Sequence, residues 1–91
     1  MEIEFDPAKN ARNIELRGLS FTLVEALDWS TAIILEDLRR DYGERRFRVF
    51  GLIGTSLHTM IFTPRGEKIR VISLRKSNLA ERKRYEHQTK R

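Results

Sequence analysis

The chain has 91 residues, of which 40% are apolar, and it contains no cysteine. This length and composition predict a single globular domain over residues 1–91, with a modest hydrophobic core. The lack of cysteine excludes a disulfide scaffold and a thiolate zinc site, and it fits a reducing cytosol. No apolar run near the start is long enough for a signal peptide or a membrane span, so we expect a cytoplasmic protein with no membrane contact.

The net charge of +5 is divided unevenly along the chain. Residues 1–44 contain 5 Lys/Arg and 10 Asp/Glu, whereas residues 45–91 contain 13 Lys/Arg and 3 Asp/Glu. The second segment therefore has a net charge of +10, which attracts polyanions because contacts to phosphates release counterions. The alternative interpretation is a solvated basic surface that only keeps the protein soluble.

A short strand and a helix are expected at the start of the chain. Ile3 and Phe5 alternate with glutamates, which is typical of an edge strand. Asp6 then fits an N-cap, Pro7 fits the first helical position, and Gly18 is well placed to end the helix. The apolar positions of this helix are Ala8, Ala11, Ile14 and Leu16. A second, shorter helix is expected to open at Ser20-Phe21-Thr22.

The centre of the chain changes to the two-residue period of strands. Residues 31–35 form a β-branched apolar run, and residues 46–53, 57–63 and 68–75 read as three further strands. Within residues 46–53, alternation puts Phe47, Val49 and Ile53 on one face and Arg46, Arg48, Phe50 and Leu52 on the other. The turns predicted between the last three, at residues 54–56 and 64–66, are too short for parallel connections and predict an antiparallel meander. In the last strand, simple alternation places Ile69, Val71 and Ser73 on one face. It places Arg70, Ile72 and Leu74 on the other.

A closing helix follows the meander. Asn78 can cap it, Glu81 can complete a capping box, and Leu79 and Tyr85 can face the sheet. The residues between 36 and 44 are expected to form a polar loop, in which Glu36, Asp37 and Asp41 are solvated. The predicted fold class is α+β, with N-terminal helices and a C-terminal helix packed on an antiparallel sheet.

The sequence lacks the residue patterns that several common kinds of catalytic site require. His58 and His87 have no second ligand at metal-binding spacing, so we expect no metal site and no cofactor. Ser73 has no histidine close in sequence and no nucleophile-elbow glycines, which argues against a serine hydrolase. No clustered carboxylates indicate a two-metal nuclease.

What remains is a basic constellation around one tyrosine, in and after the meander. A nuclease without a metal must neutralise the charge that develops at phosphorus, and guanidinium groups do this well. Tyr85, flanked by Arg82, Lys83 and Arg84, is a candidate for proton transfer. Judged from spacing alone, the alternative to this catalytic role is that Tyr85 packs the helix against the sheet.

Three blocks of the sequence resemble the BrnT family of toxins. The first is Asp6-Pro7-Ala8-Lys9 with Asn13, Gly18 and Ser20-Phe21, the second is Gly43-Glu44-Arg45-Arg46-Phe47 with Gly51, and the third covers residues 69–76 with Glu81 and Tyr85-Glu86. The resemblance implies a RelE-like fold and the toxin half of a type II toxin–antitoxin system. It further implies metal-independent RNA cleavage that inhibits translation. The partner it implies is a BrnA-type ribbon-helix-helix antitoxin, through which alone the toxin would contact DNA.

The resemblance also implies the site residues. The catalytic candidates are Lys9, Arg46, Arg70, Arg75, Glu81 and Tyr85, and the RNA-binding candidates are Arg48, Ser73, Lys76, Arg82 and Lys83. Arg46, Arg70 and Arg75 are assigned to phosphate and transition-state stabilisation, Lys9 to RNA contact or acid catalysis, and Tyr85 with Glu81 to proton transfer. Glu44 is a further functional candidate, although Glu44 and Glu81 can instead pair with nearby arginines.

The chain departs from the family pattern at two places. The family commonly has a Lys-His pair where this chain has Leu16-Arg17, and a small residue where it has Leu74. If that histidine contributes to catalysis in the family, the activity of this chain is weakened, or the chain uses Arg17 at that place only electrostatically. Two other functions stay open at this point: a non-catalytic RNA- or ribosome-binding module, and a corepressor partner of a DNA-binding antitoxin.

Overall fold

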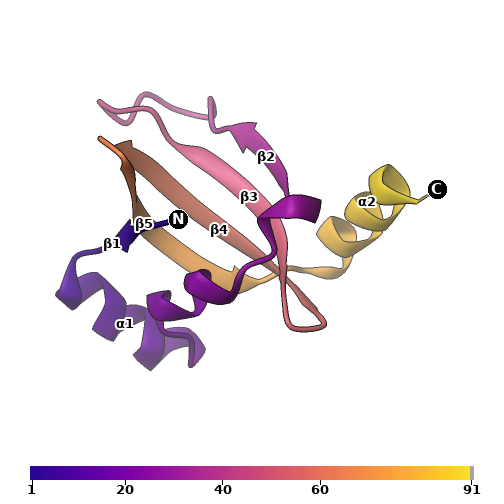
Figure 1. The fold of residues 1–91 in the computed structure, drawn as a ribbon, viewed down its shortest axis with the longest axis horizontal. Helices are drawn as coiled ribbons and strands as arrows, with labels where there is room; N and C mark the ends of the chain where they lie inside the picture. The colour runs from indigo at the N-terminus through magenta and orange to yellow at the C-terminus, as the bar shows by residue number, and fades with distance from the viewer. Residues whose placement is uncertain (91) are drawn as a thin grey trace.

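The computed structural model describes residues 1–90, which form a five-stranded sheet with the strand order β1-β5-β4-β3-β2 (Figure 1). The strands are β1 (Ile3–Glu4), β2 (Ile33–Glu36), β3 (Phe47–Ile53), β4 (Ser56–Arg65) and β5 (Lys68–Lys76). β2 to β5 pair antiparallel as expected, but β1 pairs parallel with β5. The sheet is therefore mixed, and the prediction of a purely antiparallel sheet was wrong.

The predicted first helix is confirmed as α1 (Pro7–Arg17), with Asp6 as N-cap and Gly18 in the left-handed conformation at its end. The buried residue of α1 is Asn13, whereas Ile14 and Leu16 are exposed, so the predicted apolar face was wrong. The Asn13 side chain donates hydrogen bonds to the carbonyls of Leu19 and Leu74, at 2.9 and 3.0 Å. β1 is too short to cover the whole outer edge of β5, and α1 covers part of the rest through this polar contact.

The second predicted helix is a 3₁₀ helix, η1 (Phe21–Ala26), followed by a single 3₁₀ turn, η2 (Trp29–Thr31). Ser20 caps η1, accepting a hydrogen bond from the backbone N–H of Thr22. η1 supplies the apolar cover that α1 does not. The core cluster lies between η1 and one face of the sheet and consists of Phe21, Val24, Leu27, Val49, Met60, Phe62, Ile69, Val71 and Leu74.

The helix α2 (Leu79–Thr89) closes the chain, with the predicted capping box of Asn78 and Glu81 present. None of its residues is buried, and Leu79 is 57% exposed, so the expectation that Leu79 faces the sheet was wrong. In Figure 1, α1 and α2 lie at opposite ends of the sheet. No helix within residues 1–90 is long and apolar enough to cross a membrane.

Candidate active site

One face of the sheet packs against η1, and the opposite face, which we call the open face, carries most of the predicted site residues. Register places Arg48 beside Ile61, and Phe50 beside Thr59. Alternation along β3 then puts Arg46, Arg48 and Phe50 on the open face, opposite the buried Val49. This is the face that the sequence pattern assigned to the two arginines.

A β-bulge in β5 brings Arg70 and Arg75 onto this same face. Ile61 pairs with Ser73 and Phe62 with Val71, so Ile72 has no partner directly opposite. The extra residue shifts the alternation by one position. Leu74 is therefore fully buried on the core side, and the prediction that it shares a face with Arg70 was wrong. Simple alternation would have placed Arg70 and Arg75 on opposite sides of the sheet.

Arg75 is held by Glu81 from the first turn of α2. The two guanidinium Nη atoms donate to the two carboxylate oxygens at 2.7 and 2.9 Å. Glu81 also accepts hydrogen bonds from the backbone N–H of Asn78 and from the Thr59 hydroxyl. The Arg75 hydrogen bonds lower the pKa of the Glu81 carboxyl to about 2, and those same bonds raise the pKa of Arg75. Glu81 is thus ionised at neutral pH.

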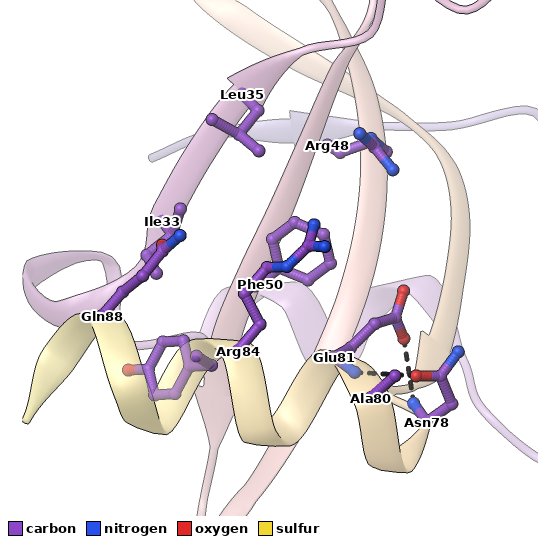
Figure 2. Close-up of a pocket in the computed structure, with 10 residues that line it drawn as sticks. Ile33, Leu35, Arg48, Phe50, Asn78, Ala80, Glu81, Arg84 and Gln88 are labelled. Carbon is purple, nitrogen blue, oxygen red and sulfur yellow. Dashed lines mark hydrogen bonds between the residues drawn. The ribbon is translucent and has the colours of Figure 1, made fainter.

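A hollow of about 220 Å³ lies between the open face and α2. Its sheet side is formed by Ile33, Leu35, Arg48 and Phe50, and its helix side by Asn78, Ala80, Glu81, Arg84, Tyr85 and Gln88. Figure 2 shows Glu81 and Arg84 projecting from α2 toward the sheet residues. The hollow therefore combines an apolar floor with two guanidinium groups, a carboxylate and a phenol.

Tyr85 lines this hollow and also fastens α2. Its hydroxyl donates a hydrogen bond of 2.9 Å to the carbonyl of Thr31, just before β2. The packing role and the functional role that the sequence left as alternatives are thus compatible. The Tyr85 side chain lines the hollow and also makes the hydrogen bond that holds α2 to the sheet.

The other arginines of the open face differ in their partners. Arg46 donates to Glu44 at 3.1 Å, and its guanidinium lies over the Tyr42 ring at 4.4 Å from the centroid. Arg70 lies 3.5 Å from a Glu4 carboxylate oxygen. The Nε atoms of Arg48 and Arg70 are buried and make no hydrogen bond with any atom of residues 1–90. Nε of Arg70 is the atom that pairs with Glu4, whereas Nε of Arg48 has no carboxylate partner among these residues, and a buried donor of that kind is costly unless a ligand accepts from it.

Lys9 and Ser73 do not line the hollow beside α2. They line a separate, shallower hollow of about 160 Å³ beside α1, together with Arg12, Arg17 and other residues of that region. This hollow shares no lining residue with the one beside α2. Lys76, Arg82 and Lys83 are exposed, the first at the end of β5 and the others on α2. The structure therefore brings Arg48 and Arg75 together with Glu81 and Tyr85. Arg46 and Arg70 pair with Glu44 and Glu4 instead, and Lys9 lies beside α1.

Sequence reasoning missed Asp37 and Arg39. Asp37 was expected in a solvated loop, yet its side chain is fully buried and pairs with Arg39. One sequence signal was available, because Ile33, Leu35 and Asp37 follow the same two-residue period. Among residues 1–90 no group of three or more His, Cys, Asp or Glu side chains could hold a metal ion.

The arrangement suits chemistry on a polyanion. Guanidinium groups bind phosphate oxygens through paired hydrogen bonds, and they stabilise charge that develops on those oxygens. A phenol within the same hollow can transfer a proton. The open face thus has the groups that a phosphodiester reaction needs, on rigid strands and at the first turns of a capped helix.

A family model described as the ribonuclease toxin BrnT of type II toxin–antitoxin systems matches residues 5–81. The comparison with curated proteins gave no match. The α+β fold, the cationic open face and this match define a ribonuclease toxin of a type II system, whose partner is a protein antitoxin and whose substrate is RNA. The chain belongs to the BrnT family. Tyr85 lies beyond the matched segment, so its role is argued from the geometry of this chain.

Proposed function

We propose that this chain is a metal-independent endoribonuclease whose active site is the hollow between the open face and α2. The observation that carries the proposal is the meeting of Arg48, Arg84 and Tyr85 in one hollow, next to the Arg75–Glu81 pair. An RNA phosphate in this hollow would meet cationic donors from both sheet and helix. The apolar side chains of Ile33 and Phe50 would lie against a base or ribose.

The proposed reaction is an internal transesterification of RNA. The ribose 2′-oxygen loses its proton and forms a bond to phosphorus, the bond from phosphorus to the 5′-oxygen breaks, and the 5′-oxygen takes up a proton. The products are a 2′,3′-cyclic phosphate and a 5′-hydroxyl. Arg75 and Arg48 stabilise the negative charge that grows on the phosphate oxygens in the transition state.

Tyr85 is the proposed proton-transfer group. Its hydroxyl can accept the proton of the 2′-hydroxyl while its own proton passes to the 5′-oxygen, so that the phenol ends unchanged. Glu81 is a weak base, because the pKa of its carboxyl is lowered to about 2 and efficient bases have a pKa near the working pH. We therefore assign Glu81 a positioning role for Arg75.

The wider function follows from the family. We propose that residues 1–91 act as one RelE-like toxin domain in the cytoplasm, where RNA cleavage inhibits translation. The proposed antitoxin is of the BrnA type with a ribbon-helix-helix domain, and DNA is contacted only through it. Of the separately placed residues, Lys9 and Ser73 would contact RNA outside the hollow. Lys76, Arg82 and Lys83 would add diffuse attraction to the strand.

The test is cleavage of end-labelled RNA by the purified protein in excess EDTA. We expect the unsubstituted chain to leave 2′,3′-cyclic phosphate ends, and Arg75→Ala and Tyr85→Phe each to lose about 100-fold or more in rate. Lys68→Ala is the matched control, because it removes one positive charge at the start of β5, where Lys68 lies 3.8 Å from Glu2. RNA that is bound but left intact, with or without ribosomes, would contradict the proposal and favour a binding module.

A further inference from the structure

The loop between β2 and β3, residues 37–46, is built around a buried carboxylate. The Asp37 side chain has no exposed surface, and it accepts hydrogen bonds from Nε and Nη2 of Arg39, both at 2.8 Å. The Tyr42 hydroxyl donates a third hydrogen bond of 3.0 Å to it. The Arg39 hydrogen bonds hold the pKa of the Asp37 carboxyl well below its usual range, so it stays ionised.

Asp37 lies on the open face. Its backbone N–H donates to the carbonyl of Arg46 at 2.7 Å, which continues the β2–β3 ladder by one position beyond the end of β2. Ile33 and Leu35 line the hollow, and Asp37 is the next residue of the same parity. The loop that begins here therefore starts from the same side of the sheet as the active-site hollow.

The pair with Asp37 fixes the direction of the Arg39 guanidinium and leaves part of it unused. Asp37 occupies the edge formed by Nε and Nη2, whereas Nη1 makes no hydrogen bond within residues 1–90, and the side chain is 57% exposed. An arginine held by one edge presents its other edge for a second bidentate contact. Burying a carboxylate costs free energy, and an exposed ion pair would stabilise the loop about as well. The burial is thus better explained by orientation than by stability.

The positive charge of Arg39 also acts on Arg75. It is the smallest of the influences on the pKa of Arg75, and it opposes the rise in that pKa that the Glu81 hydrogen bonds cause. Two like charges that act on each other repel, and an anion bound between them lowers the repulsion. Arg39 and Arg75 come from opposite sides of the open face, one from a loop after β2 and the other from β5.

We propose that Arg39 is a phosphate-binding residue of the RNA site and that Asp37 is its positioning residue. Arg39 would hold a backbone phosphate next to the one that reacts, so that the substrate is a strand extending past the hollow toward residues 37–46. The inference rests on the proposed function only in taking the polyanion to be RNA.

The experiment measures binding of a short single-stranded RNA to the full chain, by fluorescence anisotropy over a range of salt concentrations. All variants carry Tyr85→Phe, so that cleavage does not obscure binding. We expect Arg39→Ala to weaken binding by about tenfold and to lower the slope of log K against log salt by about 0.7, the value for one phosphate contact to a single strand. Arg40→Ala is the matched control: it removes the same charge one residue away, at a side chain that is exposed.

The role of Asp37 is tested by non-additivity. Asp37→Asn is expected to weaken binding as Arg39→Ala does, and the double variant to weaken it no further, because Asp37 acts through Arg39. The double variant also removes the unpaired buried carboxylate that Arg39→Ala alone would leave, so it tests the inference even if the single variant is unstable. Thermal unfolding of each variant shows whether it is folded.

Two results would overturn the inference. One is an equal loss of affinity and of salt slope for Arg40→Ala and for the double variant. This result would show that Arg39 contributes only non-specific electrostatic attraction. The other is a chain with Asp37→Asn that binds RNA as tightly as the chain that keeps Asp37. Either result leaves the proposed function intact if the chain with Tyr85 cuts RNA in EDTA, whereas a chain that does not cut RNA but needs Arg39 to bind it overturns only the proposed function.

Discussion

The Arg75 guanidinium and the Glu81 carboxylate meet through two hydrogen bonds of 2.7 and 2.9 Å, and this contact joins the end of β5 to the first turn of α2. No residue of α2 is buried, so apolar packing does little to hold the helix. The pair is completed by the Thr59 hydroxyl, which donates to Glu81, and by the Tyr85–Thr31 hydrogen bond further along. The same arginine that we assign to the transition state therefore also anchors the helix that carries Tyr85.

Glu81→Gln separates these two roles. We expect it to lower the free energy of unfolding by about 1–2 kcal/mol, because it replaces a charge-assisted pair with a neutral contact. RNA affinity should rise by about threefold, since a negative charge is lost and Arg75 is released toward phosphate. Urea unfolding and RNA binding measure the two effects. Glu86→Gln, an exposed change of the same charge on the same helix, should alter neither; tighter binding by both variants would show that only net charge matters.

The Arg75–Glu81 pair should also make the free energy of unfolding depend on pH. The pKa of Glu81 falls from 4.5 to about 2 on folding, so the folded state favours the ionised form. Its contribution is therefore complete above about pH 5 and disappears as the pH falls toward 2. Asp37, whose pKa is also lowered, acts with the same sign. We expect urea unfolding, followed by Trp29 fluorescence, to depend less steeply on pH between 5 and 2 in Glu81→Gln, and parallel curves would contradict the assignment.

Much of the fold could be predicted because its signals are local. The caps of α1 at Asp6 and Gly18, and the capping box of Asn78 and Glu81, are short-range patterns that the structure confirms. The hairpin between β4 and β5 was predicted at residues 64–66, but β4 continues to Arg65 and the turn lies at residues 66–67. A proline near a strand end reads as a turn, although an edge or end position of a strand also tolerates it.

The predictions that were wrong concern features that depend on contacts between residues far apart in the sequence. The bulge at Ile72 is visible only from the register with β4, and it decides which face Leu74 occupies. The orientation of α1 depends on Asn13 and Leu74, which are 61 residues apart in sequence. The parallel pairing of β1 likewise joins the two ends of the chain, as Ile3 beside Ile69. No single segment of the sequence contains these relationships.

The candidate site was predictable to a similar degree. Alternation over residues 46–53 separated Arg48 and Phe50 from Val49. The structure confirms this, because Val49 is buried in the core whereas Arg48 and Phe50 line the hollow. Lys9 was grouped with the catalytic residues by motif, but the fold puts it beside α1. Asp37 was missed because charged residues in a loop are usually solvated, and burial of this one depends on the neighbouring Arg39 and Tyr42.

Tyr85→Phe distinguishes anchoring from proton transfer. The variant loses the hydrogen bond to the Thr31 carbonyl, which should cost about 1 kcal/mol of unfolding free energy. If Tyr85 transfers the proton, the single-turnover cleavage rate at saturating RNA falls by about 100-fold or more. Thr89→Val removes a different single hydrogen bond of α2, from Thr89 to the Tyr85 carbonyl, and should leave the rate unchanged. A comparable loss of rate in both variants would assign Tyr85 to anchoring alone.

Gly51 and Leu27 give a test of the core that is independent of the site. A Cβ built on Gly51 would lie 3.1 Å from three side-chain carbons of Leu27, which is itself 5% exposed. Gly51→Ala should therefore lower the free energy of unfolding by about 1–3 kcal/mol through overpacking. Leu27→Ala should lower it by about 2–5 kcal/mol through the cavity it leaves.

The two changes should not be additive. In Leu27→Ala the clash is gone and the added methyl group fills part of the cavity, so Gly51→Ala should there be neutral or stabilising. Gly54→Ala is the control: nothing lies within 4 Å of its Cβ, and its cost comes from a φ of +62°, so it should be the same with or without Leu27. Additive losses for Gly51→Ala would show that Leu27 can move aside. RNA affinity should be unchanged throughout, because Gly51 faces the core and the basic residues lie on the opposite side of the sheet.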